Sequence, residues 1–378
     1  MKIVIAPDAF KECLNPIQVA TAIEYGLRMS FPDEEIIRVP CADGGEGTLL
    51  CLQASTSLSL HTVVVSGPLG NKRKAHFGSF PGTKTAVIEM AEASGLSLVP
   101  VQKRNILMSS TFGVGELIKA ALDQGFQTLI ICLGGSATCD AGIGALSALG
   151  VQFRDRENQP LSAIPLNLGK IAHIDTENLD SRLEQTEIIL AHDVNNPLLG
   201  LEGALMYAPQ KGATPEEVEI LHKGLEAFHF VLSKTTHKNV GNIPGGGAAG
   251  GLGAGIDALL NARFERGASL IMHYTGMLEK LADADLVITA EAKIDRQTLH
   301  GKTVSAVAKL AHLQGIPVIA LAATLEEGYD AIYHEGVDAV FSIVTGPMSK
   351  EESMANTKGL LIQTAHNIGR LIKIGKLL

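Results

Sequence analysis

The stretch 284–303 combines an apolar run with charged side chains that could bind a ligand and take part in catalysis. Leu286–Thr289 is a short run of three apolar residues and a threonine, so we predict a buried strand there. Ligands of open α/β sheets bind outside the carboxyl ends of the strands. The sequence therefore predicts a ligand site directly after this strand. The candidate charged residues in the predicted loop are Glu291, Lys293, Asp295 and Lys302.

Two more carboxylates follow predicted strands near the start of the chain. Asp8 follows the apolar run 3–6, and Asp43 follows the predicted strand 35–40. If these strands and 286–289 are neighbours in one sheet, their acidic residues lie close together. Several carboxylates beside lysines suit a divalent cation and a phosphorylated ligand. The predicted metal ligands are Asp8, Asp43, Glu291 and Asp295, and the lysines beside them are Lys11 and Lys293. The alternative is that the carboxylates only cap the following helices.

Glycine-rich turns form a second group of candidate ligand contacts. One turn, 134–142, follows the predicted strand 128–133, and the hydroxyls of Ser136 and Thr138 could help its backbone amides to bind an anion. Another, 244–255, opens a predicted helix. The predicted phosphate-binding glycines are Gly134, Gly135, Gly245, Gly246, Gly247, Gly250 and Gly251, together with Lys302. The alternatives are a tight strand–helix turn and a flexible hinge. Gly301-Lys302-Thr303 resembles the end of a Walker A loop, but Arg296 stands where the first glycine of that loop should be. The first predicted strand is followed by PDAFK and by no dinucleotide fingerprint.

Asp193 and Lys211 are candidates of a different kind. Asp193 comes just after the predicted strand 187–191 and could accept a proton from a substrate hydroxyl. Lys211 lies shortly before a predicted capped helix and could pair with a substrate carboxylate or with a phosphate. Taken singly, a residue of either kind more often has a structural role.

The elements that must position these residues form two groups. Residues 1–60 show two β–loop–α units and residues 284–378 show three, which predicts one five-stranded parallel, flavodoxin-like sheet in a discontinuous domain. Residues 61–283 mix a hairpin signal with helices, which predicts an inserted α/β domain with a mixed sheet. Two domains joined by two chain crossings would leave a cleft for the ligand.

Composition excludes several classes of protein. The 378 residues carry a net charge of -9, which argues against a nucleic-acid partner. The five cysteines contain no C-x-x-C pair, so we expect reduced thiols in a cytoplasmic protein. No apolar stretch approaches the roughly 20 residues of a membrane span. The sequence leaves open whether the chain forms a homo-oligomer.

Seven collinear motifs resemble those of the bacterial type I glycerate kinases (glycerate 2-kinases). They are APDAFKE, PCADGGEGT, GGSATCDAG, DVNNPLLG, QKGAT, PGGGAAGGLGAG and ITAEAKIDRQTLHGKT. The resemblance implies phosphorylation of D-glycerate with ATP and Mg²⁺, in a cleft between two α/β domains. It favours 2-phosphoglycerate as the product, with 3-phosphoglycerate as the alternative. The family has glycine where this chain has Ala141, Ala290 and Ala292, and an alanine forced to positive φ would cost on the order of 1 kcal/mol.

Together with this resemblance, the residue patterns suggest a mechanism. Asp193 would take the glycerate hydroxyl proton, and lysines would offset charge on the transferring phosphoryl group. The predicted catalytic residues are Asp193, Asp43, Lys11 and Lys293, with Lys211 as a further candidate cation. Two other functions stay open: a non-catalytic two-domain protein that binds a small anion, and an isomerase-type enzyme acting on a sugar phosphate.

Overall fold

The computed structural model describes residues 1–10, 13–295, 298 and 302–375, so Lys11 lies outside the described residues. Contacts between Cα atoms divide the chain into two compact units. Unit 1 contains Met1–Asp43, Leu50–Ser57 and Arg266–Leu378, and unit 2 contains Gly44–Leu49 and Leu58–Glu265. The predicted domain boundaries near residues 60 and 284 stay a prediction.

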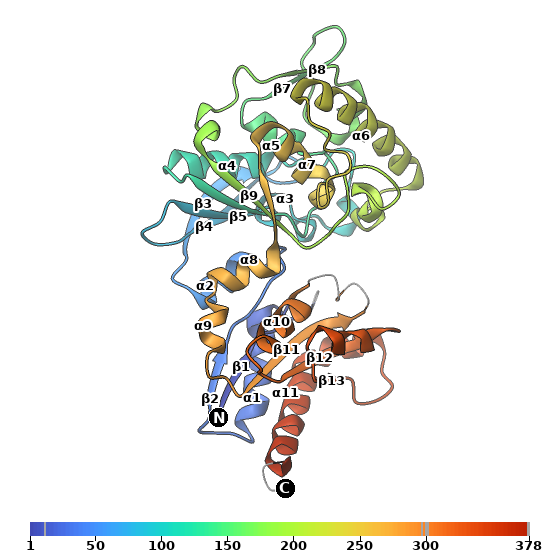
Figure 1. Cartoon of the computed structure of the whole chain (residues 1–378). Helices are drawn as coiled ribbons and strands as arrows, with labels where there is room; N and C mark the ends of the chain where they lie inside the picture. Colours follow the sequence, from blue (N-terminus) through green and yellow to red (C-terminus); the bar gives the residue numbers. More distant parts are fainter. Residues whose placement is uncertain (11–12, 296–297, 299–301, 376–378) are drawn as a thin grey trace. The chain divides into compact units, whose positions relative to one another are not determined.

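Unit 1 is built on a five-stranded sheet in the order β13-β12-β11-β1-β2 (Figure 1). Every neighbouring pair in this sheet is parallel. This is the flavodoxin-like arrangement, so the predicted fold class is confirmed. The strands are β1 (Lys2–Ile5), β2 (Glu35–Arg38), β11 (Leu286–Ile294), β12 (Val318–Leu325) and β13 (Ala339–Ser342).

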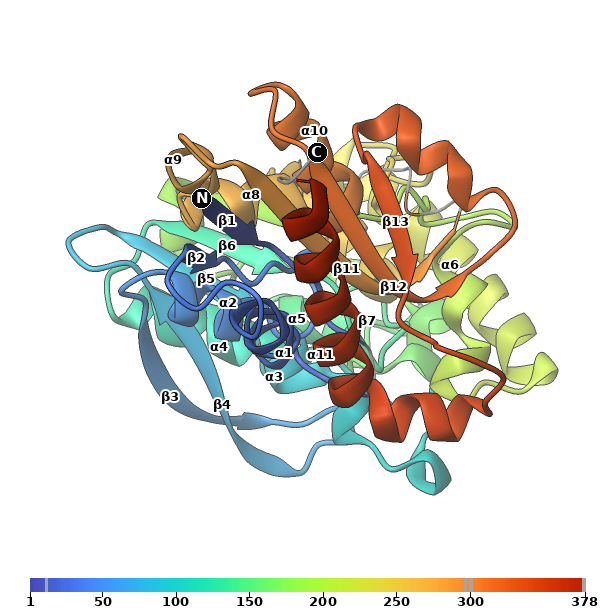
Figure 2. The same cartoon turned by 90° about the horizontal axis from the view of Figure 1, so that it is seen from below.

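Helices cover both faces of this sheet because alternate side chains of each strand point to opposite faces. Ile3 and Ile5 pack in one core with residues of α1 and α11, which lie side by side in Figures 1 and 2. Val4 and Ala6 pack in a second core with residues of α8, α9 and α10. The helix bounds are α1 (Pro16–Arg28), α2 (Thr48–Ser55), α8 (Gly267–Tyr274), α9 (Met277–Leu281), α10 (Thr303–His312) and α11 (Lys350–Gly375).

Two sequence predictions in this unit are wrong in detail. The strand predicted over 286–289 continues to Ile294, because β11 stays paired with β12 as far as Ile294 and Leu325. Glu291 and Lys293 therefore lie in the strand and not in the loop after it. The helix expected in the second of the three β–loop–α units of residues 284–378 is a 3₁₀ helix, η8 (Tyr329–Glu335), between left-handed glycines at 328 and 336.

Unit 2 contains a six-stranded sheet in the order β10-β9-β6-β5-β4-β3. The pairs β3–β4 and β4–β5 are antiparallel, whereas β5–β6 and β6–β9 are parallel. The prediction of a mixed sheet is therefore confirmed. The strands are β3 (Ser59–Ser66), β4 (Lys72–Ser79), β5 (Thr85–Glu89), β6 (Thr128–Cys132), β9 (Glu187–His192) and β10 (Arg263–Arg266), and β7 (Gln152–Arg154) pairs separately with β8 (His173–Asp175).

The helices of unit 2 pack their apolar residues on this sheet in one large core. The α-helices are α3 (Ala91–Ser94), α4 (Phe112–Asp123), α5 (Ile143–Ala148), α6 (Pro215–Thr236) and α7 (Ala248–Leu260). The 3₁₀ helices are η1 (Leu96–Leu98), η2 (Val101–Lys103), η3 (Pro165–Lys170), η4 (Ser181–Gln185), η5 (Ala204–Tyr207) and η6 (Pro209–Lys211). The capping box predicted at Thr214 is present, with Glu217 as its partner.

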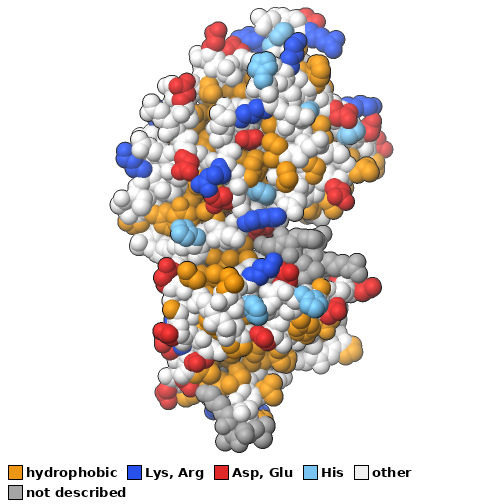
Figure 3. Space-filling view, in the orientation of Figure 1, with side chains coloured by type: hydrophobic (Ala, Val, Ile, Leu, Met, Phe, Trp, Pro, Cys, Tyr) orange, Lys and Arg blue, Asp and Glu red, His pale blue; other side chains and the backbone are white. Residues whose placement is uncertain are grey.

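The charge distribution on the surface and the lengths of the helices are two further features of the structure. On the face shown in Figure 3, basic and acidic side chains are interspersed and form no large patch of one sign. Of the helices that the structure describes, none is long and apolar enough to cross a membrane.

Candidate active site

Two of the predicted carboxylates of unit 1 lie on adjacent strands. Asp8 follows β1, and its backbone N–H donates to the carbonyl O of Ala290 in β11 at 2.7 Å, one residue before Glu291. A threonine hydroxyl donates to each carboxylate. Thr303 Oγ1 donates to Asp8 Oδ2 at 2.5 Å, and Thr298 Oγ1 donates to Glu291 Oε1 at 2.5 Å. Parallel pairing of β1 with β11 thus brings these two acidic residues to one edge of the sheet.

Burial and neighbouring negative charge both act on Glu291. Its side chain is 7% exposed. The pKa of this carboxyl is raised to about 7, mainly by burial. The hydrogen bond from Thr298 and the charge of Lys302 lower this pKa, and the charges of Asp8 and Asp295 raise it. A cation placed beside Asp8 and Glu291 would relieve this unfavourable charge.

These carboxylates fit the donor set that Mg²⁺ uses with phosphorylated substrates. Mg²⁺ is typically held by one or two carboxylates together with substrate phosphates and water. Asp8 and Glu291 supply two such carboxylates. Within the described ranges, no group of three or more His, Cys, Asp or Glu side chains is placed to hold a metal ion by itself. The whole predicted ligand set, Asp8, Asp43, Glu291 and Asp295, stays a prediction.

Lys293 and Asp295 form an ion pair with each other. Lys293 Nζ lies 2.7 Å from Asp295 Oδ2 and 3.2 Å from Glu326 Oε1. The hydrogen bond to Asp295, with a smaller contribution from Glu326, raises the pKa of Lys293. Both partners stabilise the charged lysine on the strand that carries Glu291. Its proposed catalytic role requires that this ammonium also reach the substrate.

The other predicted residues of unit 1 lie at the ends of secondary-structure elements. Asp43 follows β2, the strand beside β1, and is partly buried. Lys302 is the residue before α10, with extended backbone, and its charge acts on Glu291. Both lie at the carboxyl edge of the sheet, as the sequence predicts for ligand-binding positions.

Lys211 in unit 2 is a buried ammonium with neutral hydrogen-bond partners. Its side chain is on η6 and is 7% exposed. Nζ donates to Ser136 Oγ at 2.7 Å and to the carbonyl O of Thr138 at 2.6 Å, and Cys139 Sγ lies 3.8 Å away. A buried charge without an opposite charge is costly. The arrangement therefore favours an anion near this lysine.

Thr138 adds a second feature that points to a polar ligand. The residue is fully buried, and in the part of the chain that the structure describes its Oγ1 has no hydrogen-bond partner. A buried hydroxyl without a hydrogen-bond partner lowers the stability of the folded protein by about 1–3 kcal/mol. We name Lys211, Ser136 and Thr138 the Lys211 cluster. It joins two predicted residues of the 134–142 turn with the lysine predicted to bind a carboxylate or phosphate.

The glycine-rich segment packs tightly on the same turn. A Cβ on Gly250 would lie 2.0 Å from the carbonyl O of Thr138, and Ala141 N donates to Gly250 O at 3.0 Å. Gly250 and Gly251 have φ of 67° and 92°, so the regular part of α7 begins after them. The two predicted glycine turns are therefore in direct contact.

The first glycines of this segment contact the loop after β9. A Cβ on Gly245 would lie 2.2 Å from the His192 ring, and Gly247 N donates to the carbonyl O of Asn196 at 2.9 Å. The N–H groups of Gly246 and Gly251 also donate to backbone carbonyls, at 2.9 and 3.2 Å. These glycines serve close packing in this conformation, beside the loop that carries Asp193. Their role in binding phosphate stays a prediction.

The structure shows which of the three alanine positions needs positive φ. Ala141 has φ of 50°, whereas Ala290 and Ala292 lie in β11 and are not among the described residues with positive φ. The strain expected from the family comparison thus falls on Ala141 alone. Nearby, Asp140 is fully buried and accepts hydrogen bonds from Thr111 N and Thr111 Oγ1 at 2.7 and 2.8 Å, so it fixes the turn.

Comparison with known proteins gives the family of this chain. A family model described as "Glycerate kinase family" matches residues 3–373. The chain is 45% identical to a glycerate kinase of Halalkalibacterium halodurans, over 97% of each chain. It is 41% identical to the glycerate 2-kinase of Escherichia coli K12, over 99% of each chain. A crystal structure from Salmonella typhimurium LT2, provisionally assigned as glycerate kinase 2, matches with a TM-score of 0.84 and 42% identity, covering 100% of both chains.

The chain belongs to the glycerate kinase family. It is therefore a kinase, which confirms the resemblance seen in its motifs. The alternatives of a non-catalytic anion-binding protein and of an isomerase are wrong.

Sequence reasoning missed one buried acidic residue of this kinase, Glu89. It is the last residue of β5 and is 3% exposed. The signal was available, because a carboxylate at the end of an apolar strand is what singled out Asp8 and Asp43. Residue 89 stands inside the longer apolar run 86–91, where it reads as part of the strand.

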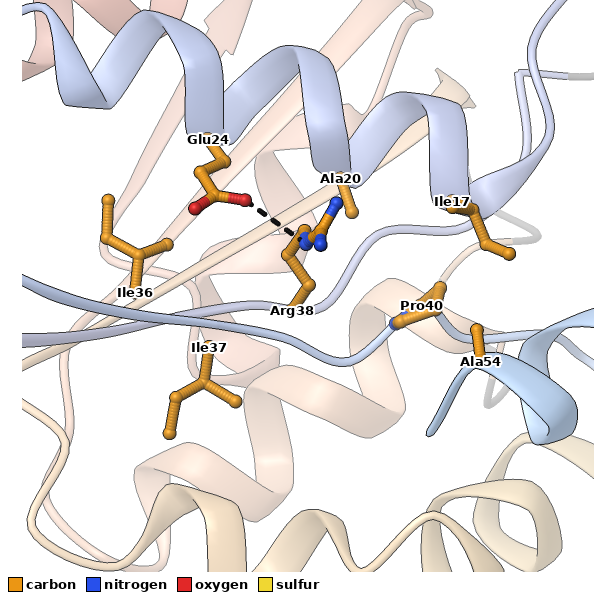
Figure 4. A pocket seen from close by; sticks show the side chains of 8 residues that line it. All are labelled: Ile17, Ala20, Glu24, Ile36, Ile37, Arg38, Pro40 and Ala54. Atoms are coloured by element: carbon orange, nitrogen blue, oxygen red, sulfur yellow. Dashed lines mark ion pairs between the residues drawn. The ribbon is translucent and has the colours of Figure 1, made fainter. Parts of the chain in front are cut away.

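A pocket of about 370 Å³ in unit 1 has none of the predicted site residues of the kinase in its lining (Figure 4). It lies between α1 and the edge strand β2, and Arg38 pairs with Glu24 inside it at 3.1 Å. Apart from this pair its lining is apolar: Ile17, Ala20, Ile36, Ile37, Pro40 and Ala54. It offers no group of converging polar side chains for a phosphorylated ligand.

Glu291 predicts how the stability of the kinase depends on pH. Its pKa is about 7 in the folded protein against an ordinary value of 4.5. The folded state then binds this proton more tightly than the unfolded state does. The stabilisation from protonated Glu291 is therefore complete below pH 4.5 and is lost as pH rises through about 7. Glutamine cannot ionise, so between about pH 5 and about pH 8 we expect the free energy of unfolding to fall by about 1–3 kcal/mol less in Glu291→Gln than in the wild type. Urea unfolding at the two pH values measures this difference. An unchanged pH dependence would contradict the burial of an ionisable group here, and the surface change Glu327→Gln is the control.

Proposed function

We propose that this protein transfers the γ-phosphoryl group of ATP to D-glycerate and releases ADP and phosphoglycerate. Membership of the glycerate kinase family supports the acceptor and the donor. The E. coli relative, a glycerate 2-kinase, supports phosphorylation of the 2-hydroxyl. The two domains 1–60 with 284–378 and 61–283, and a site in a cleft between them, stay part of the proposal from the sequence.

The observation that carries the proposal is the Lys211 cluster. Both substrates are anions, and the cluster offers a buried ammonium, its neutral partner Ser136 Oγ and the Thr138 hydroxyl, which has no hydrogen-bond partner among the described residues. Ser136 Oγ accepts from Lys211, and a serine hydroxyl that accepts one hydrogen bond can also donate one to a ligand. The positive charge of the cluster suits a carboxylate and a phosphate equally well, because both are anions. Binding an anion would offset the cost of the buried ammonium.

Asp8 and Glu291 are the carboxylates that we propose hold Mg²⁺. When bound with ATP, the ion would offset negative charge on the phosphate oxygens. Lys302, whose charge already acts on Glu291, would add positive charge at this edge of the sheet. Phosphoryl transfer needs mainly such positioning and electrostatic stabilisation from the protein.

Asp193 is the proposed base and Asp43 a proposed catalytic carboxylate. The base would accept the proton that the glycerate hydroxyl loses as its oxygen bonds to phosphorus. We expect Asp193→Asn and Asp43→Asn each to lower glycerate-dependent ADP release by at least about tenfold, because an amide cannot accept that proton or offset a cation. Measurement of kcat for both variants, with thermal unfolding as the control for folding, tests these roles. Full activity in both would show that the assignment is wrong.

The assay that tests the proposed function is ADP release with and without D-glycerate. A coupled enzyme reaction measures the rate, and a phosphorus NMR spectrum of the product identifies the phosphorylated hydroxyl. The proposal expects ADP release only with glycerate and a 2-phosphoglycerate signal. A 3-phosphoglycerate signal would overturn the position, and release independent of glycerate would overturn the reaction.

A further inference from the structure

Glu89 is a buried carboxylate that the proposed reaction does not use. Both of its oxygens accept hydrogen bonds from backbone amides of one short segment. Gly47 N donates to Oε1 at 2.8 Å, and Leu49 N donates to Oε2 at 3.0 Å. A single side chain at the end of β5 thus fixes two positions of the segment Gly44–Leu49.

The segment Gly44–Leu49 also contacts the turn after β6. Gly134 N donates to the carbonyl O of Gly44 at 3.2 Å. A Cβ on Gly134 would lie 2.4 Å from Gly45 Cα, so the two backbones touch directly. The turn at this point leads straight into Ser136 and Thr138 of the Lys211 cluster.

Sheet register explains why one side chain can connect these parts. In the parallel pair β5–β6, Glu89 is opposite Cys132. The turn that carries Ser136 and Thr138 follows Cys132, so it starts beside the backbone of Glu89. A carboxylate at this position can reach a segment that packs on the same turn.

We infer that Glu89 is a positioning residue of the kinase: it holds the segment Gly44–Leu49 against the turn after β6 and so fixes the turn that carries Ser136 and Thr138. The inference rests on the kinase reaction and the anion site proposed above. Glu89 acts through the backbone and not by contact with a substrate. The residue next to the segment in the chain is Asp43, a proposed catalytic carboxylate.

The surroundings of Glu89 make its charge state sensitive to pH. Burial raises its pKa to about 7, the amides of Leu49 and Gly47 lower it, and the charges of Glu92 and Glu46 raise it. Glu92 itself accepts from His76 N at 2.9 Å and lies 2.9 Å from its Nδ1. Protonation of Glu89 would remove part of its capacity to accept hydrogen bonds.

Glu89→Gln tests the inference, because its NH₂ group cannot accept a hydrogen bond from a backbone amide. We expect amide hydrogen exchange within 44–49 to become at least about tenfold faster while exchange in β11 and β12 is unchanged. We also expect kcat for glycerate-dependent ADP release to fall at least about tenfold. The conservative variant Glu89→Asp keeps two acceptor oxygens and should recover part of both losses. The control Glu92→Gln removes a neighbouring charge and should leave kcat within about twofold.

Other outcomes decide against the inference. Wild-type kcat with faster exchange in 44–49 would mean that the contact is only structural, and unchanged exchange there would mean that Glu89 does not hold the segment. Uniformly faster exchange, with kcat reduced only in proportion to the folded fraction, would also overturn it. If Glu89→Gln fails to fold, the same criteria apply to Glu89→Asp. Wild-type protein without glycerate-dependent ADP release would overturn the proposed function instead, and the exchange comparison would still test the contact.

Discussion

Gly250→Ala should lower the free energy of unfolding by about 3 kcal/mol or more. The added Cβ would lie 2.0 Å from the carbonyl O of Thr138, a backbone atom that cannot rotate away. Residue 250 also has φ of 67°, which costs an alanine on the order of 1–2 kcal/mol. The steric overlap of the added Cβ with its neighbours increases this loss by about 1–3 kcal/mol. Urea unfolding of the purified variant measures the sum.

Gly82→Ala is the matched control for this prediction. Residue 82 has a similar φ of 73°, but a Cβ there would meet no atom within 4 Å. Only the cost of positive φ remains, so we expect Gly82→Ala to lower the free energy of unfolding by about 1 kcal/mol. Equal losses at both positions would contradict the close packing of the glycine-rich segment on the turn after β6.

Lys211→Met should lower kcat/KM for glycerate-dependent ADP release by about 100-fold, because the variant keeps the apolar stem and removes the buried charge. The Michaelis constants then decide which anion the Lys211 cluster binds. A raised KM for glycerate identifies the substrate carboxylate, and a raised KM for ATP identifies a phosphate. Steady-state kinetics with each substrate varied in turn supply both values.

Lys223→Met is the control for the loss of one positive charge. Its side chain is 73% exposed and pairs with Glu219 on the surface of α6. An exposed pair of this kind contributes at most about 1 kcal/mol, so its kinetics should match those of the wild type. Wild-type kcat and KM in Lys211→Met would remove the main support for the anion site.

Much of unit 1 could be predicted from the sequence because its signals are local. Short apolar runs followed by helical patterns predicted the strands that precede Asp8 and carry Glu291, and a capping box of Asn15 and Gln18 begins the helix α1. The mixed sheet of unit 2 followed from the hairpin signal near Gly70. These features depend on residues close together in the chain.

Features that depend on distant partners could not be predicted. β11 extends to Ile294 because β12 continues beside it, a property of the pair and not of either run alone. The close packing of the glycines at 245–251 also depends on distant partners, because their missing side chains make room for His192 and Thr138. Glu89 gave no sign of its partners, since Gly47 and Leu49 precede it by about 40 residues.

ADP release by the wild-type protein with D-glycerate, with glycerol and with no acceptor is the most direct test that a buried cation selects an anionic acceptor. Glycerol offers the same kind of hydroxyl groups without the carboxylate. We predict rapid release with D-glycerate and background release in the other two reactions. Equal release with glycerol and D-glycerate would contradict the selection of an anion, and equal release without any acceptor would contradict kinase activity toward glycerate.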